Sequence, residues 1–232
     1  MGARIAMETD PIAGASVHIA RVNLHTVQAR VDDRPGAQVA TQRSLVEGSH
    51  RRRRFGHAPL TVWLTGLSGA GKSTIALALE KRLSAEGRAA YVLDGDNVRQ
   101  GLCRDLGFSR AARRENLRRV AEVARLMNDA GLIVITALIS PYRADRENAK
   151  TIVGADCFVE VFVDAPLAVC ERRDPKNLYR KAHKGALQDF TGVSAPYEAP
   201  ERPEVHLRTH ETSVDHAVEQ LTRHFRERGL GG

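Results

Sequence analysis

Short apolar runs alternate with amphipathic stretches from residue 60 onward. Residues 60–65 (LTVWLT), 132–139 and 157–163 are apolar almost throughout, and residues 89–93 form a shorter apolar run. Strands that are apolar on both faces are typical of a parallel sheet buried between helices. We therefore expect these four runs to be strands of one mostly parallel sheet.

The stretches between these runs have apolar residues at helical spacing. Residues 72–86 carry Ala76, Leu79 and Leu83 on one face, and residues 111–129 and 213–228 have the same kind of pattern. Strands that alternate with helices predict an α/β fold in which helices cover both faces of the sheet. We found no internal repeat.

A glycine-rich segment joins the first expected strand to the first expected helix. Residues 66–73 read GLSGAGKS, which satisfies the phosphate-binding-loop (P-loop) pattern G-x-x-x-x-G-K-[S/T]. Its backbone N–H groups can close on a polyphosphate, while Lys72 reaches the β- and γ-phosphates and Ser73 ligates Mg²⁺. The expected ATP-binding residues are Gly66, Leu67, Ser68, Gly69, Ala70, Gly71, Lys72, Ser73 and Thr74. The motif predicts a P-loop NTPase fold without identifying the phosphoryl acceptor.

Two carboxylates follow the second expected strand, in the sequence DGDNVR at residues 94–99. Ligands of open α/β sheets bind at the carboxyl ends of the strands. An aspartate there can hold a metal, orient an attacking hydroxyl or accept its proton. The alternative is a simple helix N-cap, because Asp before Asn-Val-Arg is also good capping chemistry. The residues alone favour a functional role without deciding between the two.

Charge divides the chain near residue 58. The 232 residues carry a net charge of +7, and residues 1–58, with nine Arg, no Lys and five acidic residues, account for +4 of it. We expect residues 1–58 to be a basic arm, poorly ordered or loosely attached, and residues 59–232 to be the catalytic domain. The arginine run at 51–54 could contact nucleic acid or another subunit, but it lacks interleaved aromatic residues. We therefore expect a solvated run and no nucleic-acid partner.

Three cysteines, with no C-x-x-C pair, indicate neither a disulfide framework nor a zinc site. A reducing cytoplasm fits this pattern best. No run approaches the roughly 18 apolar residues of a membrane span, so we expect no membrane association. A secretory signal is not evident, and the five acidic residues of the arm argue against a transit peptide.

Beyond the P-loop, an ordered series of blocks resembles the adenylylsulfate kinase (APS kinase) family. The blocks are LDGDNVR at 93–99, DLGFS at 105–109, the segment 113–119, ISPYR at 139–143, EVFVD at 160–164, RDPK at 173–176, FTG at 190–192 and PYE at 196–198. The resemblance covers about residues 59–204. So many blocks in order are far more specific than a lone P-loop.

The resemblance implies transfer of the γ-phosphoryl of ATP to the 3′-hydroxyl of adenosine 5′-phosphosulfate (APS), with Mg²⁺ as cofactor and a homodimer as the common assembly. It implies Lys72, Asp96 and Ser140 as catalytic residues, and Ser73 and Asp94 as metal ligands. The APS-binding positions that it implies are Asp94, Asp96, Asn97, Arg99, Leu106, Phe108, Arg113, Asn116, Ile139, Ser140, Lys176 and Phe190.

Within this set, the resemblance implies that Asp96 lies nearest the acceptor hydroxyl. Arg99 and Arg113 match positions that bind the phosphosulfate, for which guanidinium forks are well suited. Phe108 and Phe190 match the pair that sandwiches the APS adenine. Without the family match, each phenylalanine would be interpreted as a core residue.

Ser140 corresponds to a serine described in the family as a possible phosphoserine intermediate. Direct in-line transfer needs no covalent serine, so we prefer a role in lining the binding site. The basic segment 176–191 is similar to the family's mobile lid, whose closure would exclude water from the γ-phosphate. The chain departs from the family pattern at Gln100, Cys103, Ala111, Ala112, Ala137, Leu138 and Asn177, which puts substrate affinity and lid motion in question more than reaction type.

Two other classes of function remain open from the sequence. One is another P-loop kinase that acts on a nucleoside monophosphate or a sugar. The other is a nucleotide-dependent binding or regulatory module without efficient chemistry. The two-aspartate block and the two phenylalanines favour an adenylated acceptor over the first class, and the intact Lys72 and Ser73 argue against the second.

Overall fold

The computed structural model describes residue 42 and residues 44–229. Residues 46–229 belong to one compact unit. Most of the expected arm therefore lies outside the described residues. Its last part, however, contains a helix, α1 (Gly48–Phe55), and belongs to the same unit as the expected catalytic domain.

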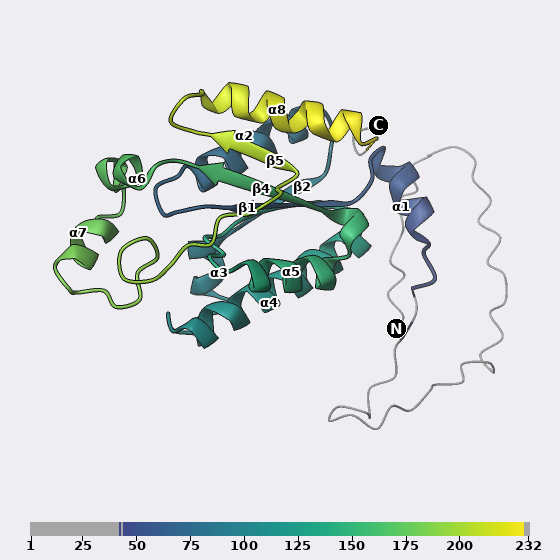
Figure 1. Cartoon of the computed structure of the whole chain (residues 1–232). Helices are drawn as coiled ribbons and strands as arrows, with labels where there is room; N and C mark the ends of the chain where they lie inside the picture. The colour runs from purple at the N-terminus through teal and green to yellow at the C-terminus, as the bar shows by residue number, and fades with distance from the viewer. Residues whose placement is uncertain (1–41, 43, 230–232) are drawn as a thin grey trace, which may run out of the picture. The chain divides into compact units, whose positions relative to one another are not determined.

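Five parallel strands form one sheet with the order β2-β3-β1-β4-β5 (Figure 1). They are β1 (Leu60–Thr65), β2 (Ala90–Asp94), β3 (Ile133–Ala137), β4 (Phe158–Asp164) and β5 (Val205–Arg208). β1 lies between β3 and β4, so the strand that leads into the P-loop is central. The four strands expected from apolar runs are confirmed, with small shifts at their ends. β5 was not expected.

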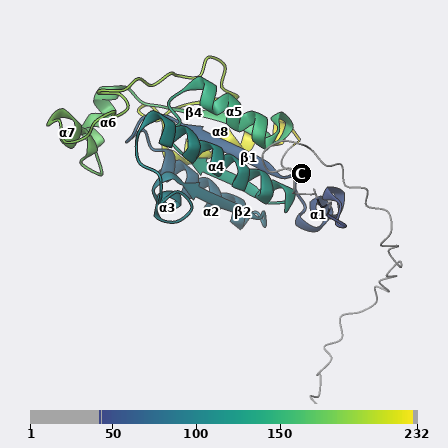
Figure 2. The same cartoon turned by 90° about the horizontal axis from the view of Figure 1, so that it is seen from below.

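Helices cover both faces of this sheet (Figures 1 and 2). One face is covered by α2 (Lys72–Ala85) and α8 (Val214–Glu227), which contact each other. The other is covered by α4 (Arg110–Asp129) and α5 (Arg143–Val153), which also pack together. The remaining helices are α3 (Gly95–Gln100), the single-turn η1 (Ala155–Cys157), α6 (Leu167–Arg173) and α7 (Leu178–His183).

The core explains why the strands read as continuous apolar runs. Every residue of β1 and β3 is buried, because side chains on both faces of each strand meet helices. One buried cluster lies toward α2 and α8, and a second, which includes Trp63 and Phe158, lies toward α4 and α5. The expected α/β architecture with a doubly covered parallel sheet is confirmed.

Helix α1 packs against the turn that follows α4. Gly131 has φ +96°, and a Cβ there would lie 2.8 Å from the ring of Phe55, so this position favours glycine on two counts. The Arg51 guanidinium donates to the carbonyl oxygen of Asp129. The end of the expected arm is thus tied to the domain by a specific contact.

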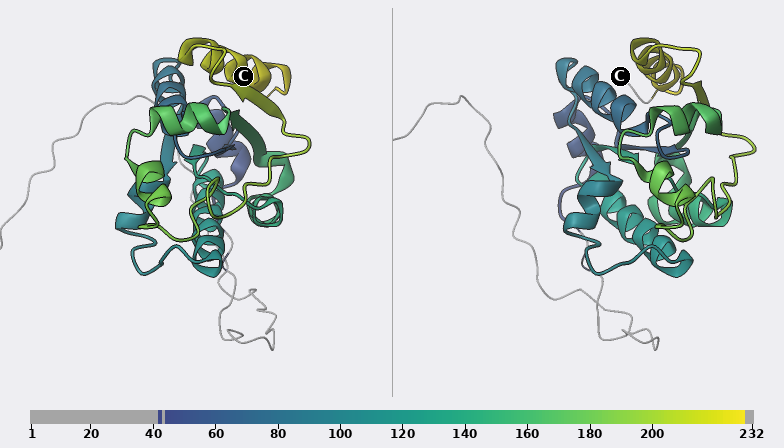
Figure 3. Two further views of the ribbon diagram at one scale, coloured as in Figure 1. Left: turned by 60° about the vertical axis from the view of Figure 1, so that its left-hand side comes forward. Right: turned by 90° about the vertical axis from the view of Figure 1, so that its left-hand side faces the viewer.

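The carboxyl ends of the strands all point toward the same edge, because every pair is parallel. α6 and α7 lie beyond this edge, at the left of Figure 1 and nearest the viewer in the right-hand view of Figure 3. None of the helices among residues 44–229 combines the length and apolar character that crossing a membrane requires.

Candidate functional site

A cavity of about 1070 Å³ opens at the carboxyl edge of the sheet. Its walls come from the P-loop, α3, the start of α4, the segment after β3 and the segment around α7. It is lined by most of the expected site residues, namely Ser68, Gly69, Gly71, Lys72, Ser73, Thr74, Asp94, Asp96, Arg99, Phe108, Arg113, Asn116, Ile139, Ser140, Lys176 and Phe190. Expected residues outside this lining are Gly66, Leu67, Ala70, Asn97 and Leu106.

The P-loop glycines allow a backbone path that other residues would obstruct. A Cβ at Gly66 would lie 2.2 Å from the carbonyl oxygen of Val163 on β4, and Gly69 and Gly71 have φ of +76° and +103°. Positive φ is costly for residues with a Cβ. Gly71 is the N-cap of α2, so the loop delivers the chain directly into the helix whose N-terminus attracts anions.

Lys72 is buried at the base of this loop. Its Nζ donates to the carbonyl oxygens of Gly66 (3.0 Å) and Leu67 (2.7 Å). Burial disfavours the charged form and lowers the pKa of Lys72 to about 8. The Lys72 ammonium group is thus held, partly shielded from water, against the backbone of the P-loop.

Asp94 connects the P-loop to the end of β2. One of its carboxylate oxygens accepts a hydrogen bond from the Ser73 hydroxyl at 2.6 Å, and the other accepts from the backbone N–H of Asp96 at 2.9 Å. The second bond makes Asp94 the N-cap of α3. The sequence offered capping for the aspartate before Asn-Val-Arg, which is Asp96, but the cap is Asp94, two residues earlier.

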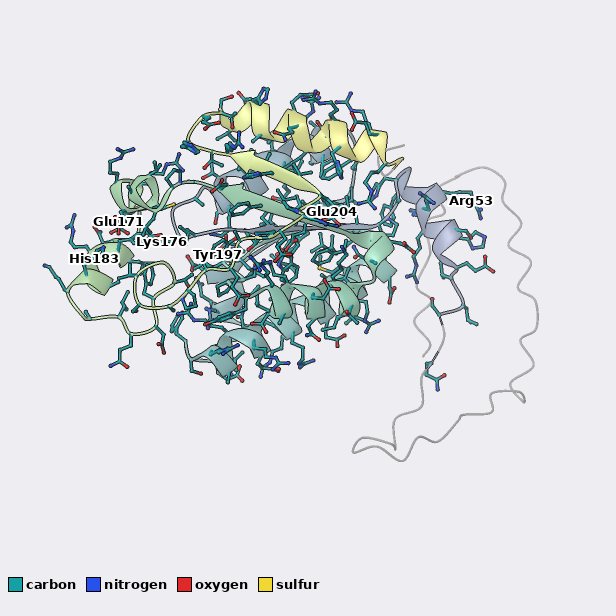
Figure 4. The ribbon with its side chains drawn as sticks, in the orientation of Figure 1. Arg53, Glu171, Lys176, His183, Tyr197 and Glu204 are labelled. Carbon is teal, nitrogen blue, oxygen red and sulfur yellow. The ribbon has the colours of Figure 1, made fainter. Side chains whose placement is uncertain are left out.

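Asp96, two residues further along the chain, points its carboxylate at Lys176, and the two form an exposed ion pair. Lys176 comes from the segment between α6 and α7 (Figure 4). Exposed pairs of this kind contribute little to stability, in the range of about 0–1 kcal/mol. The pair can therefore open readily when a ligand enters.

Arg99 and Arg113 both use backbone carbonyls as partners. Arg99 donates to Gly107 at 3.0 Å, and Arg113 donates to Phe108 at 2.7 Å and to Asp189 at 2.5 Å. Partial burial lowers the pKa of both guanidinium groups from their usual range. Neither guanidinium has a carboxylate among its hydrogen-bond partners in the described part of the chain, which leaves their charge available to an anion in the cavity.

The two phenylalanines differ in their surroundings. Phe108 is 64% exposed, with the Arg99 guanidinium 4.4 Å from its ring centroid. Phe190 is 8% exposed and packs edge-on against Tyr179, at 5.1 Å between centroids. Because both rings line the cavity, they provide one exposed and one buried apolar surface for a planar ligand.

Ser140 and Asn116 are buried polar residues in the cavity wall. The Ser140 hydroxyl accepts a hydrogen bond from the indole N–H of Trp63 at 3.2 Å, and its backbone has φ +39°. The side-chain oxygen of Asn116 has no hydrogen-bond partner among the described residues. A buried acceptor without a donor is costly, so a ligand N–H or O–H at this point would be stabilised.

The cavity wall that follows β5 includes residues to which the sequence assigned no role. Thr209, just after β5, donates its hydroxyl to the carbonyl oxygen of Ala70 at 2.7 Å, and Arg173 donates to Thr209 and to Gly69. Thr212, Ser213 and Val214 continue this wall. The only sequence signal for this wall was the RDPK block, which contains Arg173. Thr209 and the residues after it gave no signal, because β5 itself was not expected.

Several departures from the family pattern have a structural explanation. Asn177 stands where a glycine is usual and has φ +54°, and Asn tolerates this left-handed conformation better than most residues. Cys103 is fully buried, and Ala137 and Leu138 belong to the core clusters. Nothing in the structure explains Gln100, Ala111 or Ala112.

Comparisons with known proteins identify the family. The family model described as adenylylsulphate kinase matches residues 58–208. An adenylyl-sulfate kinase of Aeromonas salmonicida is 56% identical over 191 residues, which cover 82% of this chain and 97% of that protein.

Solved structures agree with the family match. The APS kinase CysC of Mycobacterium tuberculosis, solved in complex with AMPPNP and APS, is 46% identical with a TM-score of 0.70, covering 73% of this chain and 99% of that one. A hexameric APS kinase from Thiobacillus denitrificans is 34% identical with a TM-score of 0.58, covering 78% of this chain and 32% of that one. This chain belongs to the adenylylsulphate kinase family.

Proposed function

We propose that this protein transfers the γ-phosphoryl of ATP to the 3′-hydroxyl of APS, giving 3′-phosphoadenosine 5′-phosphosulfate and ADP. The observation that carries the proposal is one cavity that holds the P-loop at one end and a second cluster of arginine, phenylalanine and aspartate side chains at the other. Phosphoryl transfer asks mainly for positioning and for neutralisation of charge. The cavity offers both for two nucleotides at once, and the family match supports APS as the acceptor.

At the ATP end, the P-loop backbone would bind the phosphates. The Lys72 ammonium would exchange its two carbonyl partners for phosphate oxygens, which restores the charge that burial disfavours. Arg173 and Thr209 line the same end of the cavity, and they hold the P-loop by donating hydrogen bonds to the carbonyl oxygens of Gly69 and Ala70.

We propose Mg²⁺ as the cofactor, held by Ser73 and Asp94. A hydroxyl and a carboxylate 2.6 Å apart, beside a phosphate loop, are hard oxygen donors of the kind that Mg²⁺ prefers together with substrate phosphates. When bound, Mg²⁺ neutralises charge that develops on the transferred phosphoryl group. The residues present fit this ion.

At the acceptor end, Asp96 is the carboxylate that we assign to the 3′-hydroxyl. Asp94 already accepts two hydrogen bonds, whereas Asp96 accepts only the exposed ammonium of Lys176 from another side chain in the described chain. Asp96 is therefore free to orient the hydroxyl and take its proton as the bond to phosphorus forms. Lys176 is freed at the same time to meet phosphate.

Recognition of APS would use the remaining groups. Arg99 and Arg113 would bind the phosphosulfate through guanidinium forks, and Phe108 and Phe190 would stack on the adenine. We propose that Ser140 lines the site without becoming phosphorylated, because its hydroxyl is buried and engaged by Trp63.

We propose that the segment 176–191 closes over the two nucleotides. Its ends are fixed by the buried Tyr179, whose hydroxyl donates to the carbonyl oxygen of Ser68 at 2.9 Å, and by the buried Phe190. Between them, Gly185 has φ +72°, where a glycine allows the backbone to change course. Closure would keep water from the γ-phosphate.

The proposal is tested by coupled detection of ADP release with ATP-Mg²⁺ and different acceptors. We expect turnover with APS, no comparable turnover with AMP or gluconate, and loss of turnover in Lys72→Ala. The matched control is Lys81→Ala, which removes an exposed lysine from the same helix. Turnover on AMP or gluconate without turnover on APS would refute the proposal.

Two assignments outside the site complete the proposal. We propose a homodimer, as resemblance to the family implies, and sedimentation of the full chain would distinguish it from the hexamer reported for the Thiobacillus relative. We propose a cytoplasmic location, supported by three free cysteines and no disulfide between them. Residues 1–41 of the expected arm lie outside the described residues.

A further inference from the structure

Arg146 on α5 is a buried arginine that joins three segments at the carboxyl edge of the sheet. It is 3% exposed, and its guanidinium donates to the Glu160 carboxylate on β4 at 2.6 Å. It also donates to the carbonyl oxygens of Ser140 and Glu198, each at 2.8 Å. Arg146 does not line the cavity. Because Glu160 balances its charge, we expect the planar guanidinium of Arg146 to fix the positions of these three segments and not to bind a ligand.

The segment that Arg146 contacts has an unusual backbone. Ser140 has φ +39°, a conformation that a residue with a Cβ adopts only when its surroundings impose it. The Ser140 carbonyl is held by Arg146 and, at 3.3 Å, by the Thr65 hydroxyl. The preceding carbonyl, of Ile139, accepts from Thr65 at 2.8 Å and from the Gly66 N–H at 3.4 Å. The carbonyl oxygens of Ile139 and Ser140 are thus held by hydrogen bonds from the start of the P-loop and from Arg146, respectively.

These contacts fix the direction of one backbone donor. In a trans peptide the N–H of Ser140 points opposite to the carbonyl of Ile139, which is directed at β1 and the P-loop. Among residues 44–229 the Ser140 N–H has no hydrogen-bond acceptor. Because Ile139 and Ser140 both line the cavity, the donor is left to a ligand there.

We propose that Arg146 is a positioning residue for the acceptor nucleotide. It holds the Ser140 carbonyl while Thr65 and Gly66 hold the Ile139 carbonyl, and together these contacts keep Ser140 at its strained φ, so that the Ser140 N–H is oriented before an anionic acceptor arrives. This inference rests on the proposed function, because it assigns that donor to APS. Arg146 acts through the backbone of Ser140 and does not itself line the cavity.

The variant that tests this role is Arg146→Lys. Lysine keeps the positive charge beside Glu160, but a single ammonium cannot reproduce the planar fork that reaches three acceptors. The matched control is Arg143→Lys on the same helix. Arg143 donates to Ala199 and Glu201 in the segment that also contains Glu198, but not to Ser140. A general loosening of this region would affect both variants.

We expect Arg146→Lys to raise the KM for APS or lower kcat by about tenfold or more, as small misplacements of reacting groups do. The KM for ATP should stay within about twofold, because the P-loop keeps its own contacts. Arg143→Lys should match the wild type in both. If Arg146→Lys leaves the APS parameters unchanged, or weakens ATP and APS equally, Arg146 has no positioning role.

A second measurement covers the case in which Arg146→Lys folds poorly. Glu160→Gln keeps the arginine but removes the charge that orients it, and it should shift the APS parameters in the same direction to a smaller extent. In ¹⁵N spectra, the Ser140 amide resonance should move when APS binds the wild type; an unmoved resonance would overturn the proposal. Absence of wild-type turnover on APS would instead refute the proposed function, so the two failures are distinguishable.

Discussion

Nucleotide binding should change the protonation state of Lys72. In the free protein, burial lowers the pKa of this ammonium from its ordinary value of 10.5 to about 8. Bound phosphates place negative charge beside it and so favour the protonated form. Above pH 8, therefore, the free protein has lost a proton that the complex regains, and binding takes up a proton from solution.

The size of this proton uptake follows from the pKa of Lys72 in the free protein, about 8, and from a pKa in the complex that is restored to its ordinary value of 10.5. At pH 9 about nine-tenths of the free protein holds neutral Lys72, so binding should take up nearly one proton. Affinity should be independent of this group below pH 8 and fall by up to about tenfold per pH unit above it, or roughly 300-fold by pH 10.5.

The assay is titration calorimetry with a non-hydrolysable ATP analogue and Mg²⁺ at pH 9, in buffers of different ionisation enthalpy. The heat should depend on the buffer with a slope near one proton. Lys72→Met, which cannot titrate, should abolish the slope. Heats that do not depend on the buffer in the wild type would refute the reasoning, because they would mean that Lys72 is charged in the free protein.

The same shift predicts how stability depends on pH. Between pH 8 and 10.5 the unfolded chain binds the proton of Lys72 and the folded protein does not, so the free energy of unfolding should rise with pH. The total rise attributable to this group is about 3 kcal/mol. Urea unfolding of the wild type and of Lys72→Met at several pH values measures this contribution. It is the difference between the two proteins in how steeply the free energy of unfolding rises with pH.

Three substitutions test the local environments of the site. Phe108→Ala should raise the KM for APS while changing the free energy of unfolding by less than about 0.5 kcal/mol, because this ring is mostly exposed; steady-state kinetics and urea unfolding check both. Phe190→Ala should destabilise by about 3–5 kcal/mol by the same unfolding assay, since this ring is buried against Tyr179. Asn177→Ala should lower stability by about 1 kcal/mol and Asn177→Gly should not, because only alanine is strained at φ +54°; equal effects would contradict the backbone argument.

The sequence was sufficient for features whose cause is local. β1, the P-loop and the start of α2 could be predicted together, because an apolar run, positive-φ glycines and a helical pattern follow one another without a break. β5 could not. It has only four residues, and as an edge strand it alternates buried and exposed positions, so its apolar content is low.

Side-chain environments depended on contacts that are distant in sequence. Phe108 and Phe190 look alike as residues, yet only Phe190 is buried, because Tyr179 packs against it. Arg113 reaches Asp189, 76 positions away. The role of Arg146 likewise arises from three partners on three segments, a coincidence that no local pattern encodes.

If one cavity brings the γ-phosphoryl of ATP to the 3′-hydroxyl of APS, the phosphoryl group must pass directly from one nucleotide to the other. The most direct test supplies γ-¹⁸O-labelled ATP and APS to the full chain and identifies the labelled product by mass spectrometry and ³¹P spectroscopy. We predict that the label appears as a 3′-phosphate on the adenosine phosphosulfate. Label found only in inorganic phosphate, or at another position of the acceptor, would contradict the claim.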